Sequence, residues 1–179
     1  MRPLRQACVV LISLLTIHAI AQVRSIGNSR PNPRATFGTI SMAATPSAVN
    51  IALVSKGVSA PSVPIAVTTT WDGLSLLSTI NVYAFFGSST SALSSGATSI
   101  PSANVLGKDT TGIPTSYTPF SQGGPTPGAS LQLYSVFILI GVGHDSHTDN
   151  LTLEIDLTSL PSLPAGTYTG VLLLQAQAF

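Results

Sequence analysis

The sequence predicts an all-β domain, an antiparallel β-sandwich of about seven to nine strands. Apolar and polar residues alternate with a period of two in several stretches, most clearly over 151–157 and 168–178, as in strands that bury one face. Glycine and proline interrupt these stretches, and no amphipathic helical period is present. A closed barrel is the less favoured alternative, because the long irregular insertion 108–128 suits the end of a sandwich better.

The composition fits one globular domain with an unusually uncharged surface. Of the 179 residues, 44% are hydrophobic and 7% are charged, against roughly 25% charged in typical soluble domains. Ser, Thr, Asn and Gln must therefore supply the polar surface, which repels copies of itself weakly. From Ala35 onward the chain has two lysines against six acidic residues, a net charge of −4. Nucleic-acid binding requires a clustered basic face, so we expect no nucleic-acid partner.

Residues 1–21 have the three parts of a secretory signal peptide. Two arginines precede an apolar centre at 9–17, and Ala19-Ile20-Ala21 is a small-x-small cleavage site. The alternative, a transmembrane anchor, requires about 20 apolar residues, and this run is shorter. We expect cleavage before Gln22 and a secreted protein, in the periplasm or on the extracellular surface. Membrane contact is then expected only through the export signal.

The expected mature chain must fold without covalent cross-links. Its only cysteine, Cys8, lies within the signal, so no disulfide is expected despite export. Residues 22–36 form a polar, proline-containing, basic arm, either a disordered leader or an extension that reaches a neighbouring subunit. Residues 37–179 are expected to form the single β-sandwich domain.

The first half of this domain alternates clearly. Strands are expected, in chain order, at 40–44, 49–53, 63–71 and 76–86, separated by turn residues at 45–47, 56–57 and 72–73. Pro64 indicates a strand start or a sheet edge, because proline has no N–H to donate to the ladder.

The second half mixes loops with the most apolar segment. A low-complexity turn is expected at 87–96, a short strand at 100–106, and a Thr/Pro/Gly-rich loop at 108–128. The run LQLYSVFILI (131–140) predicts a central strand with both faces covered. A polar loop at 141–150 then leads to two closing strands, at 151–157 and 168–178.

Four residues in the predicted 141–150 loop are candidate metal ligands: His144, Asp145, His147 and Asp149. Two histidines and two aspartates this close can bind a metal, and a weak calcium site is the best functional interpretation. The HxxH spacing matches neither a helical zinc motif nor a zinc finger, and after cleavage no third histidine or cysteine completes a site. A solvated hairpin loop is the structural alternative, and no cofactor is expected.

No catalytic residues are predicted. The chain lacks the GxSxG sequence of a nucleophile elbow. Glu154 and Asp156 share one face of a strand, where carboxylates more often solvate the sheet and discourage aggregation. We therefore expect a protein without enzymatic activity.

Three aromatic residues, Trp71, Tyr117 and Phe120, are the candidate ligand-binding residues, since together they can form a platform for sugars. Trp71 lies on the apolar face of its strand and fits the core better. Tyr117 and Phe120 lie in the long loop and are the better candidates for exposure.

The C-terminal sequence LPAGTYTG (163–170), followed by alternating apolar residues, resembles the last strand of bacterial secreted immunoglobulin-like β-sandwiches. It also resembles the C-terminal strand of spore-coat-U-type pilins, which a periplasmic chaperone and an usher assemble. The segments TPSAV (45–49) and VTTTW (67–71) suit the opening strands of such domains. The whole chain is also similar to secreted proteins of environmental bacteria.

The pilin resemblance implies assembly by donor-strand exchange, with a periplasmic chaperone and with copies of the chain or other surface subunits as partners. It implies that 36–44 is the donor, with Ile40, Met42 and Ala44 entering a neighbour's groove. It also implies that the Tyr168 hydroxyl is hydrogen-bonded near a strand corner. Those pilins often carry a disulfide, which the expected mature chain lacks.

Together these observations predict an exported structural or adhesive surface protein, a fimbria-like subunit assembled through strand exchange. One alternative is a carbohydrate-binding module that uses the three aromatic residues. A second is a small secreted hydrolase or metal-dependent enzyme that uses the 144–149 segment.

Overall fold

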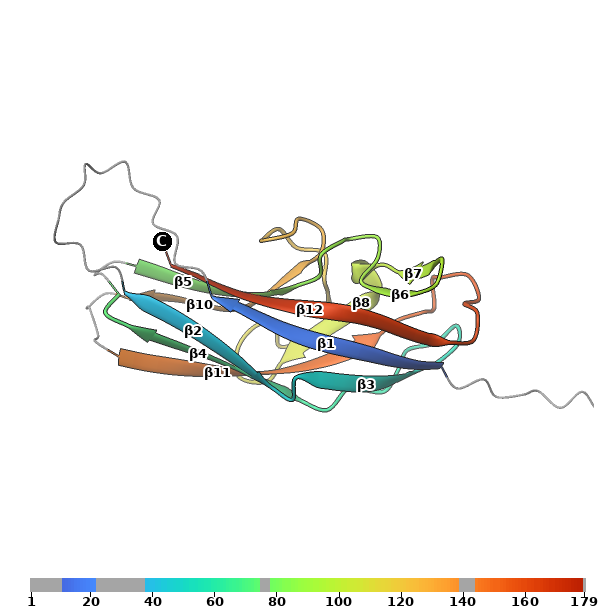
Figure 1. Cartoon of the computed structure of the whole chain (residues 1–179), viewed down its shortest axis with the longest axis horizontal. Helices are drawn as coiled ribbons and strands as arrows, with labels where there is room; N and C mark the ends of the chain where they lie inside the picture. The colour runs from blue at the N-terminus through green and yellow to red at the C-terminus, as the bar shows by residue number, and fades with distance from the viewer. Residues whose placement is uncertain (1–10, 22–37, 75–77, 139–143, 179) are drawn as a thin grey trace, which may run out of the picture.

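Two β-sheets pack face to face in the computed structural model, which confirms the predicted all-β sandwich (Figure 1). The structure describes residues 38–74, 78–138 and 144–178, and the backbone of 11–21. Within these residues the only helical element is the short 3-10 turn η1 (Ser102–Asn104). None of the described residues forms a helix long and apolar enough to cross a membrane.

Sheet A is built around the last strand of the chain. Its spatial order is β10 (Ser130–Ile138), β5 (Ser78–Phe85), β12 (Thr167–Ala178), β1 (Leu11–Ala21) and β3 (Ala48–Leu53). The short hairpin of β6 (Leu93–Ser95) and β7 (Thr98–Ile100) joins this sheet through β12. All pairs are antiparallel except β1 and β12, which run parallel.

Sheet B is wholly antiparallel. Its spatial order is β2 (Thr39–Thr45), β4 (Ile65–Asp72), β11 (His144–Ile155), β8 (Val105–Asp109) and β9 (Thr118–Pro119). The chain changes sheets between β2 and β3, at Pro46-Ser47, where the sequence predicts an interruption.

The core lies between the sheets and follows the predicted alternation. Buried hydrophobic residues alternate along five of the strands. They are Val49, Ile51 and Leu53 of β3, Ile65, Val67 and Trp71 of β4, Ile80, Val82 and Ala84 of β5, Leu151, Leu153 and Ile155 of β11, and Leu172, Leu174 and Ala176 of β12. Each fully buried aliphatic side chain contributes about 1.5–3 kcal/mol of gross stabilisation.

The prediction of a central strand at 131–140 is wrong, because β10 is an edge strand of sheet A. Its pairing with β5 shifts by one residue between Gln132 and Tyr134. Such a bulge exchanges the two faces of a strand. The inward positions therefore change from odd to even residue numbers, and Phe137 is 51% exposed despite the apolar sequence.

Two predicted loops contain strands. The 141–150 segment was expected to be a loop, but β11 begins at His144 and pairs with β4 along 144–151. The 87–96 turn contains β6, whose hairpin turns at Gly96 with φ +58°. In both cases polar or small residues occupy strand positions because a neighbouring strand supplies backbone partners.

Tyr168, near the start of β12, is fully buried, and its hydroxyl donates a hydrogen bond to the Pro164 carbonyl at 3.2 Å. This confirms the hydrogen bond expected at the strand corner. Two residues further on, a side chain on Gly170 would place its Cβ 2.2 Å from the Ala92 carbonyl oxygen. The glycine therefore lets the segment before β6 lie directly against β12.

Candidate functional site

β1 occupies the position between β12 and β3, although its residues belong to the predicted export signal (Figure 1). Its parallel ladder with β12 runs from Ile12 to Ala21. Its antiparallel ladder with β3 runs from Leu11 to Thr16. Residues 11–17 of the apolar centre of the predicted signal therefore lie in an internal strand of sheet A.

β3 depends on β1 for its sheet pairing. Among the described residues, β1 is the only strand that pairs with β3. By contrast, β12 also pairs with β5 from Leu173 onward and with β6 at Thr169. Without β1, the facing edges of β3 and β12 would present rows of unpaired backbone N–H and C=O groups. We call this position the β3–β12 slot.

The slot borders the hydrophobic core on both sides. Val49, Ile51 and Leu53 of β3 are only 2–4% exposed, and Tyr168 and Leu172 of β12 are fully buried. Removal of an internal strand between them would bring this part of the core close to water. The slot is therefore defined both by backbone pairing and by apolar surface.

The predicted exchange residues lie in sheet B of their own chain. Ile40, Met42 and Ala44 belong to β2, which pairs with β4 from Thr39 to Thr45. Ile40 is buried, and the other two are half-buried against the core. This segment thus has partners within one chain, and its exchange with a neighbour stays a prediction. Residues 36 and 37 lie outside the described residues.

The four candidate metal ligands lie on one strand, β11, but differ in exposure. His147 and Asp149 point towards the interior of the sandwich, whereas His144 and Asp145 are exposed at the start of β11. Neither the described loops nor the described strands bring together three or more His, Cys, Asp or Glu side chains in an arrangement that can hold a metal ion. Metal binding by these four residues stays a prediction.

Asp149 belongs to a buried carboxyl pair with Asp109, the last residue of β8. The two residues are 0% and 1% exposed. A Cβ on Gly112 would lie 2.6 Å from Asp149 Oδ1 and 3.3 Å from Asp109 Oδ2, so both carboxyls converge on this glycine. The Oδ2 atom of each aspartate is buried and has no hydrogen-bond partner. Two buried carboxyl groups this close together strongly disfavour a negative charge on both at once.

His147 and Tyr134 cover this pair. His147 Nε2 lies 2.9 Å from Asp149 Oδ1. The His147 ring stacks on the Tyr134 ring with a centroid distance of 3.8 Å. Because Tyr134 lies on β10 of sheet A and His147 on β11 of sheet B, the stack joins the two sheets.

Residues 110–114, which we call the strap, run beside the pair. Asp109 Oδ1 accepts hydrogen bonds from Thr111 N (2.7 Å), Thr111 Oγ1 (3.0 Å), Gly112 N (3.0 Å) and Asn150 N (3.1 Å). The strap also reaches sheet A, where Ile113 N donates to the Leu133 carbonyl at 2.9 Å. It therefore closes the side of the sandwich between β10 and β11.

The electrostatics of the pair favour a proton on Asp149. Burial, and next the negative charge of Asp109, raise the pKa of Asp149 to about 7. Burial, with the charges of Asp149 and Asp145, also raises the pKa of Tyr134. The carboxyls are closed to solvent, so this arrangement fits a structural role better than acid–base catalysis on a substrate.

The three candidate ligand-binding aromatics do not form an exposed platform. The expectation that Phe120 is exposed is wrong, because it is fully buried and packs edge-on against Phe86 at 5.1 Å. Trp71 is 4% exposed and belongs to the core, as its position on the apolar face of its strand predicted. Tyr117 is half-buried, and its hydroxyl donates to Thr152 Oγ1 at 3.3 Å.

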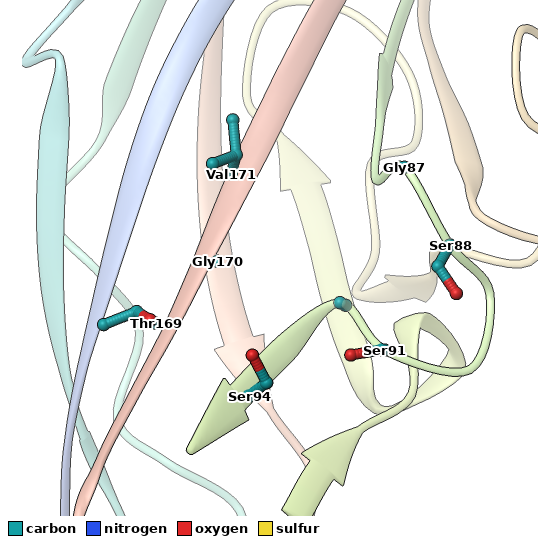
Figure 2. A pocket seen from close by; sticks show the side chains of 8 residues that line it. Gly87, Ser88, Ser91, Ser94, Thr169, Gly170 and Val171 are labelled. Atoms are coloured by element: carbon teal, nitrogen blue, oxygen red, sulfur yellow. The ribbon is translucent and has the colours of Figure 1, made fainter. Parts of the chain in front are cut away.

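A shallow depression of about 440 Å³ lies beside β12 (Figure 2). Small residues line it, namely Gly87, Ser88, Ser91, Ala92, Ser94, Thr169, Gly170 and Val171. Ser91 donates a hydrogen bond to Ser99 at 3.0 Å. The lining of the depression combines apolar surface with serine and threonine hydroxyls and carries no charge, so it offers hydrogen bonds without an acid, a base or a metal ligand.

No family model matches the chain, and no curated protein is similar to it.

Sequence reasoning missed Asp109 and Tyr134 as partners of the 144–149 segment. The alternation Leu151, Leu153, Ile155, extended backwards, would have placed Asp149 and His147 on the inward face. Asp109 opens the sequence DTTG, which is typical of an aspartate that hydrogen-bonds the turn after it. No local signal pairs Tyr134 with His147, because the bulge in β10 decides which face Tyr134 occupies.

Proposed function

We propose that the mature chain is an exported structural or adhesive subunit, without enzymatic activity, that is completed by a strand from another polypeptide. The observation that carries this proposal is the β3–β12 slot, because the segment that fills it is predicted to be removed on export. A donor strand that enters the slot satisfies the backbone groups of both edges and covers the core beneath them.

The position of β1 sets the geometry that a donor must match. The donor runs parallel to β12 over the span from Ile12 to Ala21, and antiparallel to β3 over the span from Leu11 to Thr16. A segment of about ten extended residues covers this span at roughly 3.3 Å per residue. Copies of the chain or other surface subunits can supply such a strand, and a periplasmic chaperone can occupy the slot before assembly.

The composition supports contact between subunits. Only 7% of the residues are charged, so close approach of two copies meets little electrostatic repulsion. The expected mature chain also has no cysteine, so no disulfide can close the slot. A strand from a partner is then the direct way to complete sheet A.

The test uses the mature chain, residues 22–179, and a peptide with the sequence of residues 11–21. Light scattering coupled to size-exclusion chromatography measures mass over a range of concentrations. We expect the mature chain alone to form concentration-dependent oligomers, because subunits complete one another. We expect the peptide, added in excess, to convert these oligomers into a one-to-one complex.

The matched control is the same peptide with Ser13→Pro and Thr16→Pro. Successive residues of a strand direct their N–H groups to opposite sides, so these two substitutions remove one backbone donor from each ladder. The control peptide should leave the oligomers unchanged. A mature chain that stays monomeric at every concentration and binds neither peptide would show that the slot accepts no donor.

A further inference from the structure

The charged residues of the sandwich are divided unequally between its two sheets. The strands of sheet A contain no Asp, Glu, Lys or Arg. The strands of sheet B carry Asp72, Lys108, Asp109, Asp145, Asp149 and Glu154. The face of sheet A that points away from the core, its outer face, therefore carries no charged side chain from its own strands.

Three strands of sheet A place amide and hydroxyl groups side by side on this outer face. Ser135 of β10 pairs with Asn81 of β5, which pairs in turn with Gln177 of β12. In the next row, Gln132 pairs with Tyr83. The residues that alternate with these along β5 are buried in the core, so Asn81 and Tyr83 lie on the outer face. We call six outward residues the amide face, namely Asn81, Tyr83, Gln132, Ser135, Phe137 and Gln177.

Hydrogen bonds orient the amide at the centre of this face. Asn81 Oδ1 accepts hydrogen bonds from Ser135 Oγ at 2.7 Å and from Gln132 Nε2 at 3.2 Å. Both bonds end on the oxygen, and among the described residues none involves the amide nitrogen, which has two N–H groups to donate. The side chain is therefore held in one orientation before any ligand arrives, which lowers the entropy cost of binding.

An aromatic ring lies towards each end of the amide face. The bulge after Gln132 turns Phe137 outward, where it is 51% exposed. At the other end, a Cβ on Gly124 would lie 3.2 Å from Tyr83 Cδ1, so the turn at 122–128 stands against the Tyr83 ring and bounds the face. Phe137 pairs with Thr79, four residues before Tyr83 on β5. The two rings are therefore separated by about 13 Å along the strand, at roughly 3.3 Å per residue.

This chemistry selects a neutral ligand rich in hydroxyl groups. A sugar hydroxyl both donates and accepts hydrogen bonds, and an amide side chain offers both kinds of partner. The C–H face of a sugar ring is apolar and packs on an aromatic ring, whose face carries partial negative charge. A charged ligand would lose its hydration on this face and find no ion pair in return.

We propose that the amide face binds a neutral, linear carbohydrate chain that lies along β5, between Phe137 and Tyr83. Asn81, Gln132 and Gln177 supply hydrogen bonds to its hydroxyl groups. This site uses other aromatic residues than the platform predicted from the sequence. It does not depend on strand exchange, because β10, β5 and β12 pair with one another without β1.

An NMR titration of the whole chain, in which β1 fills the slot, tests the site without any variant. The neutral probes are cellohexaose, β-1,4-mannohexaose and maltohexaose. The side-chain amide signals of Asn81, Gln132 and Gln177 should shift with at least one of them, whereas that of Asn150, on the outer face of sheet B, should not. A hexamer of galacturonic acid, a charged chain of the same length, should bind at least about tenfold more weakly.

Two variants of the whole chain locate the binding. Phe137→Ala removes an exposed ring, and Asn81→Asp keeps an oxygen for Ser135 and Gln132 but loses both amide N–H groups. Each should weaken binding of the neutral probe by at least about threefold. The matched control is Val63→Ala, because Val63 is an apolar residue that is 60% exposed and lies outside sheet A, and it should bind as the unaltered chain does.

Absence of binding to all three neutral probes would overturn the proposal, as would variants that bind as tightly as the unaltered chain. If the same amide signals shift when the protein concentration rises without sugar, the face is a contact between copies and the proposal is also overturned. Strand exchange at the slot would survive each of these results.

Discussion

The two sides of the sandwich are closed in different ways. On the β10 side, the strap hydrogen-bonds to both sheets, and the stacked rings of Tyr134 and His147 join them. Both side chains and loop backbone therefore close this side. On the β3 side, the closure consists of backbone ladders from β1 to β12 and β3. The strap directly follows β8, whereas β1 belongs to the predicted export signal.

The two sides differ in whether a segment of another polypeptide can replace the closure. The strap bonds depend on particular side chains in fixed places, above all on Asp109, and another polypeptide could not easily reproduce them. A backbone ladder accepts any extended segment of suitable polarity, because every residue except proline offers the same groups. We therefore interpret the β10 side as a permanent closure and the β3 side as a replaceable one.

The largest expected effect comes from removing the replaceable closure. Residues 22–179 should have a free energy of unfolding lower by more than about 5 kcal/mol than residues 11–179, because two ladders are lost and each net hydrogen bond contributes about 0.5–1.5 kcal/mol. Urea unfolding at low protein concentration measures the difference. A difference below about 1 kcal/mol would mean that β1 stabilises the sheet little.

A smaller effect is expected from damage to the permanent closure. Gly112→Ala would place a methyl group 2.4 Å from the Leu133 carbonyl oxygen, so the strap must shift, at a cost of about 1–3 kcal/mol. The control is Gly123→Ala, because a Cβ there meets no atom within 4 Å. Equal free energies of unfolding for the two variants would show that the close approach at Gly112 is unimportant.

The smallest effect concerns a bond that lies near the slot but does not involve β1. Tyr168→Phe removes the hydroxyl that donates to Pro164, and should cost about 0.5–1.5 kcal/mol. Tyr117→Phe should cost less, because Tyr117 and its partner Thr152 are both only half-buried. The cost at Tyr168 should be the same in residues 11–179 and 22–179. If it disappears in the shorter chain, the strand corner depends on β1.

Much of the fold was predictable from the sequence, because most strands bury one face. The alternation of Val49, Ile51 and Leu53, and that of Leu151, Leu153 and Ile155, indicates the inward positions without any knowledge of neighbours. The turn at Gly73, with φ +64°, followed from Asp72-Gly73.

The rest depended on contacts between distant residues. The apolar run of β10 suggested a central strand, but the bulge after Gln132 turned Phe137 outward. The first half of β11 resembled a loop because its residues are polar. Its contacts are with residues far away in the sequence: Asp109 accepts a hydrogen bond from Asn150 N, and Tyr134 stacks on His147. The apolar residues of β1 suit a signal peptide and a strand equally, so no local pattern indicated that they would pair with β12.

Hydrogen exchange on residues 22–179, with and without the peptide of residues 11–21, tests the central claim most directly. We predict that, at a concentration at which residues 22–179 are monomeric, the amides of β3 exchange freely in the chain alone and become protected when the peptide binds, while those of β5 are protected in both states. Protection of β3 without any peptide, in a monomer, would contradict the account. It would mean that β3 closes directly onto β12, to which it is already antiparallel, and that no strand is missing.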